Sequence, residues 1–145
     1  MVTVHVIVGI GVLLTNLLAG TWGGVAWLRE LPAVGFWYAL RVAQAAVVLQ
    51  VMLGAILVLS GRQAGDDLHY VYGVLPLVVT LLAEGARAGA AERELTGIDF
   101  DSLPEQRQRL IALAIVRRET GIMAVSALVV FALALRAAAT SGGLF

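Results

Sequence analysis

The chain has 145 residues, of which 60% are hydrophobic and 14% are charged, and its formal net charge is zero. This balance is typical of an integral membrane protein and excludes an ordinary soluble domain. A zero net charge also argues against nucleic acid or a generally anionic partner. The absence of cysteine excludes disulfides, thiolate metal sites and cysteine redox chemistry.

Four segments are apolar over a length that can cross a lipid bilayer, which requires about 20 helical residues. We expect helices at about 2–27, 36–60, 68–94 and 103–136 in a single domain that covers 1–145. The short connections make the first three helices antiparallel neighbours. The sequence therefore predicts an all-α fold: a four-transmembrane-helix up-down bundle whose third and fourth helices extend into the cytoplasm.

The start of the fourth helix carries its own signal. Ser102 and Glu105 have the spacing of a capping box, and Pro104 suits a first helical turn. We therefore expect the helix to begin close to residue 103.

The positions of the basic residues predict the orientation. All ten are arginines, and eight of them lie in or beside the first and third connections. The other side holds only Arg62 and Arg136. An excess of arginine marks cytoplasmic connections, so both termini are expected outside a bacterial cytoplasmic (inner) membrane. Four aromatic residues then fall at the inner interface as an aromatic belt, namely Trp22, Trp27, Trp37 and Tyr38.

The two histidines of the chain occur in matching patterns, HVIVG at 5–9 and HYVYG at 69–73. Both are placed near the outer ends of their helices and therefore at similar depth. Gly9 and Gly73 follow four residues later, on the same helix face and about 6 Å deeper. Each histidine alone is also compatible with a ring that reaches the lipid headgroups.

A flat cofactor between two helices fits this pattern. Haem iron binds two neutral imidazoles, and a porphyrin needs clearance where it passes between helices. We therefore predict haem b held by His5 and His69. Gly9, Gly73 and Gly54 are expected to leave clearance for the porphyrin because they have no side chain. Arg62 and Arg136 are placed to pair with the propionates. A zinc ion is the alternative, with Asp66 and Asp67 completing the ligands.

The stretch LQVMLGAILVLSG at 49–61, followed by LHYVYG at 68–73, resembles the haem A synthase family. Gln50, Gly54, Ala55 and His69 match the order of that family's motif. The resemblance implies one four-helix half of an eight-helix protein, with a bis-histidine haem site on the outer side and His5 as the second ligand. As a whole the chain also resembles small four-helix integral membrane proteins of bacteria.

Several polar residues lie within the apolar segments. Hydrogen bonds between helices are their expected role, with a quinone or lipid headgroup pocket as the alternative. They are Thr15, Asn16, Gln44, Gln50, Thr80 and Ser126. Near the inner interface, Glu84 and Arg87 have the spacing of a local ion pair.

These patterns predict a membrane b-type haem protein that works in electron transfer, with a quinone or another redox partner, or in haem handling. No catalytic motif for hydrolysis or phosphoryl transfer is present, so we lean against an enzyme; the enzymatic alternative is a haem-dependent oxidoreductase. A second hypothesis is a cofactor-free accessory subunit that docks to a larger membrane complex, or to itself as a homo-oligomer, through the 84–118 hairpin. An oligomeric transporter or channel is least favoured because the helices lack a polar stripe.

Overall fold

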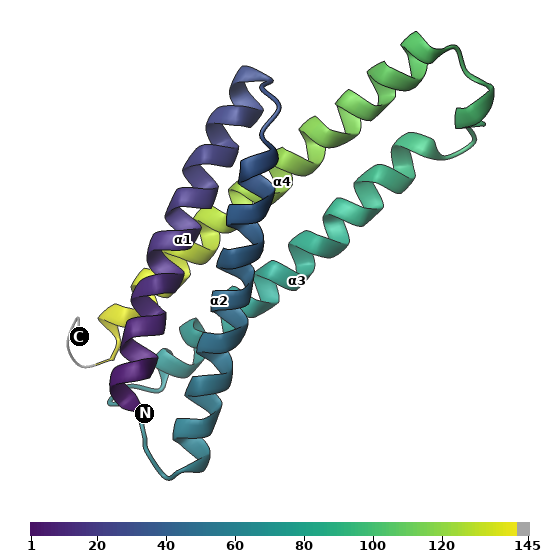
Figure 1. The fold of residues 1–145 in the computed structure, drawn as a ribbon. Helices are drawn as coiled ribbons and strands as arrows, with labels where there is room; N and C mark the ends of the chain where they lie inside the picture. Colours follow the sequence, from purple (N-terminus) through teal and green to yellow (C-terminus); the bar gives the residue numbers. More distant parts are fainter. Residues whose placement is uncertain (142–145) are drawn as a thin grey trace.

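Four long helices make up the computed structural model, which describes residues 1–141 (Figure 1). The helices are α1 (Val2–Arg29), α2 (Val34–Leu59), α3 (Leu68–Leu95) and α4 (Glu105–Ala139), and a short 3-10 helix, η1 (Phe100–Ser102), precedes α4. No strand occurs within these 141 residues. The predicted all-α, four-helix fold is confirmed, and no helix end differs from its predicted position by more than three residues.

The predicted capping box at the start of α4 is wrong. Ser102 lies in η1, where its hydroxyl donates to the backbone carbonyl of Asp99 at 2.8 Å. Pro104 is the N-cap residue, and no side chain caps the helix. The amide of Gln108 closes this turn instead, because it donates to the backbone carbonyls of Phe100 and Leu103 at 3.0 and 3.1 Å.

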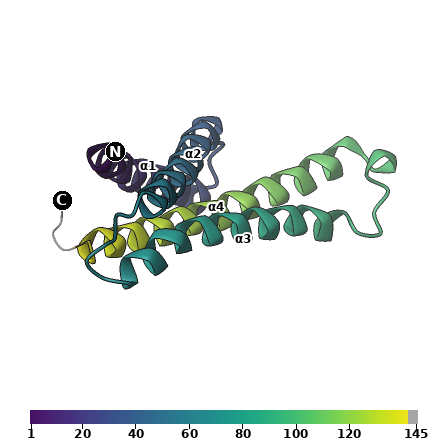
Figure 2. The same ribbon diagram turned by 90° about the horizontal axis from the view of Figure 1, so that it is seen from below.

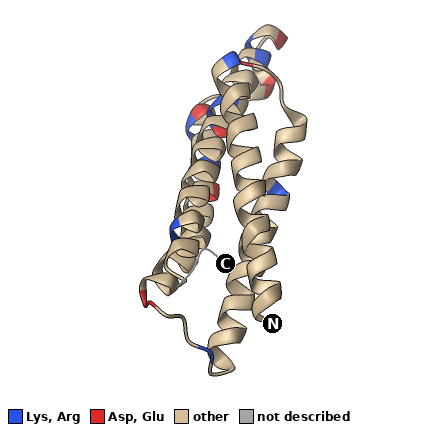
Figure 3. Cartoon of the chain, turned by 90° about the vertical axis from the view of Figure 1, so that its left-hand side faces the viewer, with Lys and Arg blue, Asp and Glu red and all other residues tan. Residues whose placement is uncertain are grey.

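All four helices are long and apolar enough to cross a membrane, so the chain is a multi-pass membrane protein. The start of α1 and the end of α4 lie at the same end of the molecule (Figure 1). At 1.5 Å per residue, the 35 residues of α4 span about 52 Å, which exceeds the roughly 30 Å of a bilayer core. Charged residues gather toward the end formed by the α1–α2 and α3–α4 turns (Figure 3). Helix α4 must therefore project beyond the lipid or tilt strongly.

The helices form two hairpins that cross and then diverge. The α3–α4 hairpin leans away from the α1–α2 hairpin, and its turn projects past the α1–α2 turn (Figures 1 and 2). Helix α4 packs along α1 and α3, whereas α2 packs mainly on α1 and meets α3 over a short length. The expected antiparallel order is present, but the short α2–α3 connection does not produce extensive packing between those two helices.

Small residues allow α1 and α4 to approach closely. A Cβ atom added to Gly20 would lie 2.6 Å from Leu128 Cδ2, and one added to Gly121 would lie 2.8 Å from the Trp27 ring. Glycines at such crossings let membrane helices gain van der Waals contact that bulkier residues would prevent. The main core cluster beside this crossing consists of Ala19, Phe36, Leu40, Ala43, Ala83, Met123 and Ala127.

A polar cluster centred on Glu84 joins the two hairpins. Its carboxylate accepts hydrogen bonds from Arg41 at 2.5 Å and Gln44 at 2.7 Å, both on α2. Arg87 on α3 donates to the same carboxylate at 2.9 Å and also pairs with Glu119 on α4 at 3.7 Å. The predicted Glu84–Arg87 pair is confirmed, but it is one part of a cluster that links three helices.

We expect Glu84→Ala to destabilise the protein by about 1–3 kcal/mol, because two arginines and an amide lose the acceptor that they share. Thermal unfolding of the purified protein in detergent measures this change. Glu92→Ala is the matched control, since Glu92 is an exposed residue of the same helix with no ion pair among residues 1–141. Equal stability of the two variants would show that the cluster does not hold the hairpins together.

Candidate functional site

The two histidines of the chain lie side by side. His5 is in the second turn of α1 and His69 is in the first turn of α3. Their ring centroids are 6.3 Å apart, with 57° between the ring planes. Both side chains are half-buried. Residues 64 positions apart in sequence therefore form one site, which we call the histidine pair.

This separation fits two imidazoles bound to one metal ion. A histidine nitrogen lies about 2 Å from a metal, and each ring nitrogen lies about 1 Å from its ring centroid, so two opposed rings have centroids about 6 Å apart. Haem iron takes only two protein ligands of this kind. No group of three or more histidine, aspartate or glutamate side chains suited to a metal ion occurs in residues 1–141.

A backbone carbonyl holds His69. Its Nδ1 lies 2.9 Å from the carbonyl oxygen of Ala137, near the end of α4. A carbonyl can only accept, so Nδ1 donates its proton there, and the neutral tautomer with this hydrogen bond has its lone pair on Nε2. Nε2 makes no hydrogen bond to any residue in 1–141. Metal-binding histidines are commonly oriented in this way, by a second partner on the other ring nitrogen.

Gln50 on α2 holds His5. The two Nε2 atoms lie 3.1 Å apart, so the amide N–H donates to the ring nitrogen. The other ring nitrogen, His5 Nδ1, is buried and has no hydrogen-bond partner among the described residues, and the same is true of Gln50 Oε1. Such unpaired buried polar atoms cost free energy and call for an explanation, such as a bound group.

The three glycines of the predicted site have different surroundings. A Cβ atom on Gly9 would lie 3.1 Å from the Gln50 amide nitrogen, and one on Gly54 would lie 3.3 Å from Cε1 of His5. These two glycines therefore provide the space in which the Gln50 and His5 side chains lie. Gly73 meets nothing within 4 Å.

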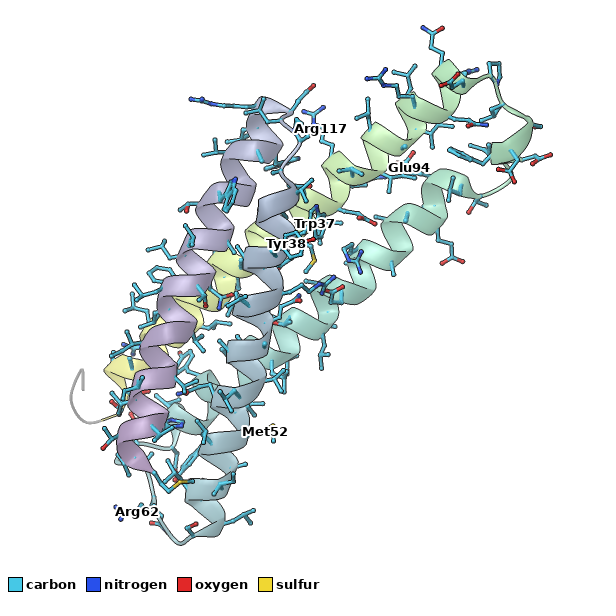
Figure 4. The ribbon with its side chains drawn as sticks, viewed as in Figure 1. Trp37, Tyr38, Met52, Arg62, Glu94 and Arg117 are labelled. Carbon is cyan, nitrogen blue, oxygen red and sulfur yellow. The ribbon has the colours of Figure 1, made fainter. Side chains whose placement is uncertain are left out.

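The two arginines predicted to pair with propionates lie at the same end of the molecule as the histidine pair. Arg62 is exposed in the α2–α3 turn (Figure 4). Arg136 is exposed on α4, and its guanidinium lies 5.8 Å from the centroid of the Tyr72 ring. A guanidinium over an aromatic face is held by cation–π attraction. Of the two cations, Arg136 is thus the one positioned by a neighbour on α3.

Most of the polar residues in the apolar segments do not bond between helices, contrary to the prediction. Asn16 donates to the carbonyl of Val12 and Thr80 to that of Pro76, within their own helices. Thr15 and Ser126 behave in the same way. Hydroxyl and amide groups on a helix reach the carbonyl one turn back, which satisfies them locally. Only Gln44 and Gln50 of this set bond to another helix.

Of the four aromatic residues near the opposite end, Trp22, Trp27 and Tyr38 are exposed and Trp37 is half-buried, and Trp27 and Trp37 also contact other helices. Trp27 lies on Gly121, and the Trp37 ring lies 5.9 Å from the Arg87 guanidinium. Tyr38 is exposed, and Trp37 and Tyr38 lie together near the start of α2 (Figure 4). An open apolar groove of about 580 Å³ lies beside Trp27, between α1, α3 and α4, with Arg118 at its edge. This groove is well separated from the histidine pair.

Sequence reasoning missed the Ala137 carbonyl, and it predicted an interhelical hydrogen bond for Gln50 without identifying His5 as the partner. Gln50 belongs to the stretch that resembles the haem A synthase family. The resemblance indicated a function at that position but did not identify the hydrogen-bond partner of Gln50. No sequence signal indicates Ala137, because its contribution is a backbone carbonyl. Comparison of the chain with known proteins found no matching family model, no similar curated protein and no similar solved structure.

Proposed function

We propose that this protein binds one b-type haem at the histidine pair and works in electron transfer or haem handling. The observation that carries the proposal is the pair itself, in which two imidazoles on different helices lie 6.3 Å apart between centroids. Each ring has one nitrogen bonded to protein and one without a protein partner in residues 1–141. His69 would bind iron through its Nε2, whereas His5 would bind through the Nε2 that now accepts from the Gln50 amide, since Nδ1 carries the proton of a neutral His5 ring.

The residues around the pair have defined roles in this proposal. His69 and His5 would hold the iron, and the hydrogen bond to the Ala137 carbonyl would orient His69 and make its ring a better electron donor. Arg136 and Arg62 would neutralise the propionates at the membrane surface. The bound haem supplies reversible one-electron exchange. The polarity and solvent access of the surrounding helices would help to set its potential.

The chain alone can test this proposal by its absorption spectrum. Protein expressed with added haem and purified in detergent is expected to show a Soret band and about one haem per chain. The double variant His5→Ala/His69→Ala is expected to show neither, because the chain contains no other histidine. Gln44→Ala, away from the pair, is the control. Wild-type protein without a Soret band, or a band that survives in the folded double variant, would refute the proposal.

The proposed orientation places both termini and the α2–α3 turn outside the bacterial cytoplasmic membrane, with the α3–α4 turn in the cytoplasm. The uneven distribution of arginine supports it. In that orientation the histidine pair lies near the outer surface. Electrons would then be exchanged with a partner on that side or with a quinone in the bilayer.

Because the chain has no cysteine, single introduced cysteines can report the orientation. In intact cells, Gln63→Cys in the α2–α3 turn is expected to react with a membrane-impermeant maleimide. Asp101→Cys in η1 is expected to react only after the membrane is opened. The reverse pattern of labelling would place the histidine pair on the cytoplasmic side and overturn the proposed orientation.

A second candidate function is an accessory subunit that docks through the 84–118 hairpin. The observation that favours it is a set of exposed apolar residues on the part of α4 nearest the turn, where Leu110 and Leu113 are each 58% exposed and Val116 is 47% exposed. If this part of α4 leaves the lipid, these side chains need a protein cover.

The accessory hypothesis makes a separate prediction. Leu110→Glu/Leu113→Glu is expected to abolish co-purification of a partner or self-association in detergent, measured by native mass spectrometry, because a carboxylate opposes burial against protein. The double histidine variant is expected to retain the association. Monomeric wild-type protein with no partner would exclude this function.

A further inference from the structure

The two histidines are held in different ways. The carbonyl that accepts from His69 Nδ1 fixes the ring as the tautomer whose Nε2 carries the lone pair. Nε2 is the nitrogen farther from the main chain, so a planar cofactor can approach it without meeting the Cβ atom. His69 is therefore oriented as a ligand before any metal binds.

His5 is oriented differently, because its Nε2 already accepts a hydrogen bond from the Gln50 amide at 3.1 Å. The nitrogen without a partner is Nδ1, which is buried and lies next to the Cβ atom. While Nε2 accepts from Gln50, Nδ1 carries the proton of a neutral ring and would have to lose it to bind iron, and a porphyrin there would also press against Cβ. Coordination through Nε2 instead requires that the Gln50 amide move away. Binding of iron through either nitrogen of His5 therefore costs free energy that binding through His69 Nε2 does not cost.

The packing around Gln50 holds its amide beside His5 Nε2, where the amide competes with a metal for that nitrogen. The Gln50 amide lies against Gly9, and the His5 ring lies against Gly54, in space that any larger side chain would fill. Both contacts lie between α1 and α2 and involve no residue of α3. The α1–α2 hairpin thus gives His5 a partner of its own that does not depend on His69.

We infer that His69 is the fixed ligand of the haem site and His5 the exchangeable one. This inference rests on the proposed function. A small neutral diatomic ligand would bind the reduced site on the His5 side. His5 Nε2 would release the iron to the lone pair of the incoming ligand and would return to the hydrogen bond from the Gln50 amide that the structure shows. No electron is transferred in this exchange. The site would therefore bind small ligands in addition to transferring electrons.

Single variants and carbon monoxide test the inference. His69→Ala is expected to lose haem, whereas His5→Ala is expected to keep it with a five-coordinate, high-spin spectrum. Wild-type protein reduced with dithionite is expected to bind carbon monoxide, with a shift of the Soret band. Equal loss of haem in both single variants, or no spectral change with carbon monoxide, would overturn the inference while leaving the haem itself in place.

Gln50→Leu provides a second test that leaves both histidines present. Without the competing amide, His5 Nε2 binds iron more firmly, so the Kd for carbon monoxide is expected to rise about fivefold. Gln44→Leu, a change of the same kind on the same helix, is expected to leave the Kd unchanged. An unchanged or lower Kd in Gln50→Leu would overturn the role assigned to Gln50. Absence of a Soret band from every sample would instead contradict the proposed function, because no haem would be bound.

Discussion

The close approach of α1 to α4 is the constraint on which the site depends. Gly20 and Gly121 remove the two side chains that would hold these helices apart, and Leu128 and Trp27 occupy the space. Helix α4 also packs along α3 and so connects the two hairpins. Because α4 lies against both, His5 on α1 reaches His69 on α3, and the end of α4 supplies the Ala137 carbonyl.

The two ends of the bundle hold their polar groups by different means. At one end Glu84 carries a charge that is met by Arg41 and Arg87, so the hairpins are joined by ion pairs and charge-assisted hydrogen bonds. At the other end His5 bonds to Gln50 and His69 bonds to the Ala137 carbonyl, and His5 Nδ1 and Gln50 Oε1 are left buried without a partner among the described residues. The first arrangement is satisfied, whereas the second leaves buried polar atoms without a protein partner among the described residues, and this difference marks the second as the candidate binding site.

Sequence reasoning predicted the fold well because the signal is simple. Long apolar runs between polar turns gave helix ends within three residues, and the Glu84–Arg87 spacing indicated a pair that the structure contains. The matched depth of His5 and His69 also followed from helix order alone. Hydrogen bonding was predicted less well: Asn16 and Thr80 bond within their own helices, since a carbonyl one turn back is always in reach. The contacts of Gln50 and Ala137 depend on how the hairpins cross, which no local pattern encodes.

The central claim is that both imidazoles bind one haem iron, and near-infrared magnetic circular dichroism of the oxidised, haem-loaded protein tests it most directly. The position of the charge-transfer band in this spectrum identifies the pair of axial ligands. The account predicts the low-spin band of two neutral histidines. A high-spin band, or one that belongs to a different ligand pair, would contradict the assignment of His5 and His69 to the same iron.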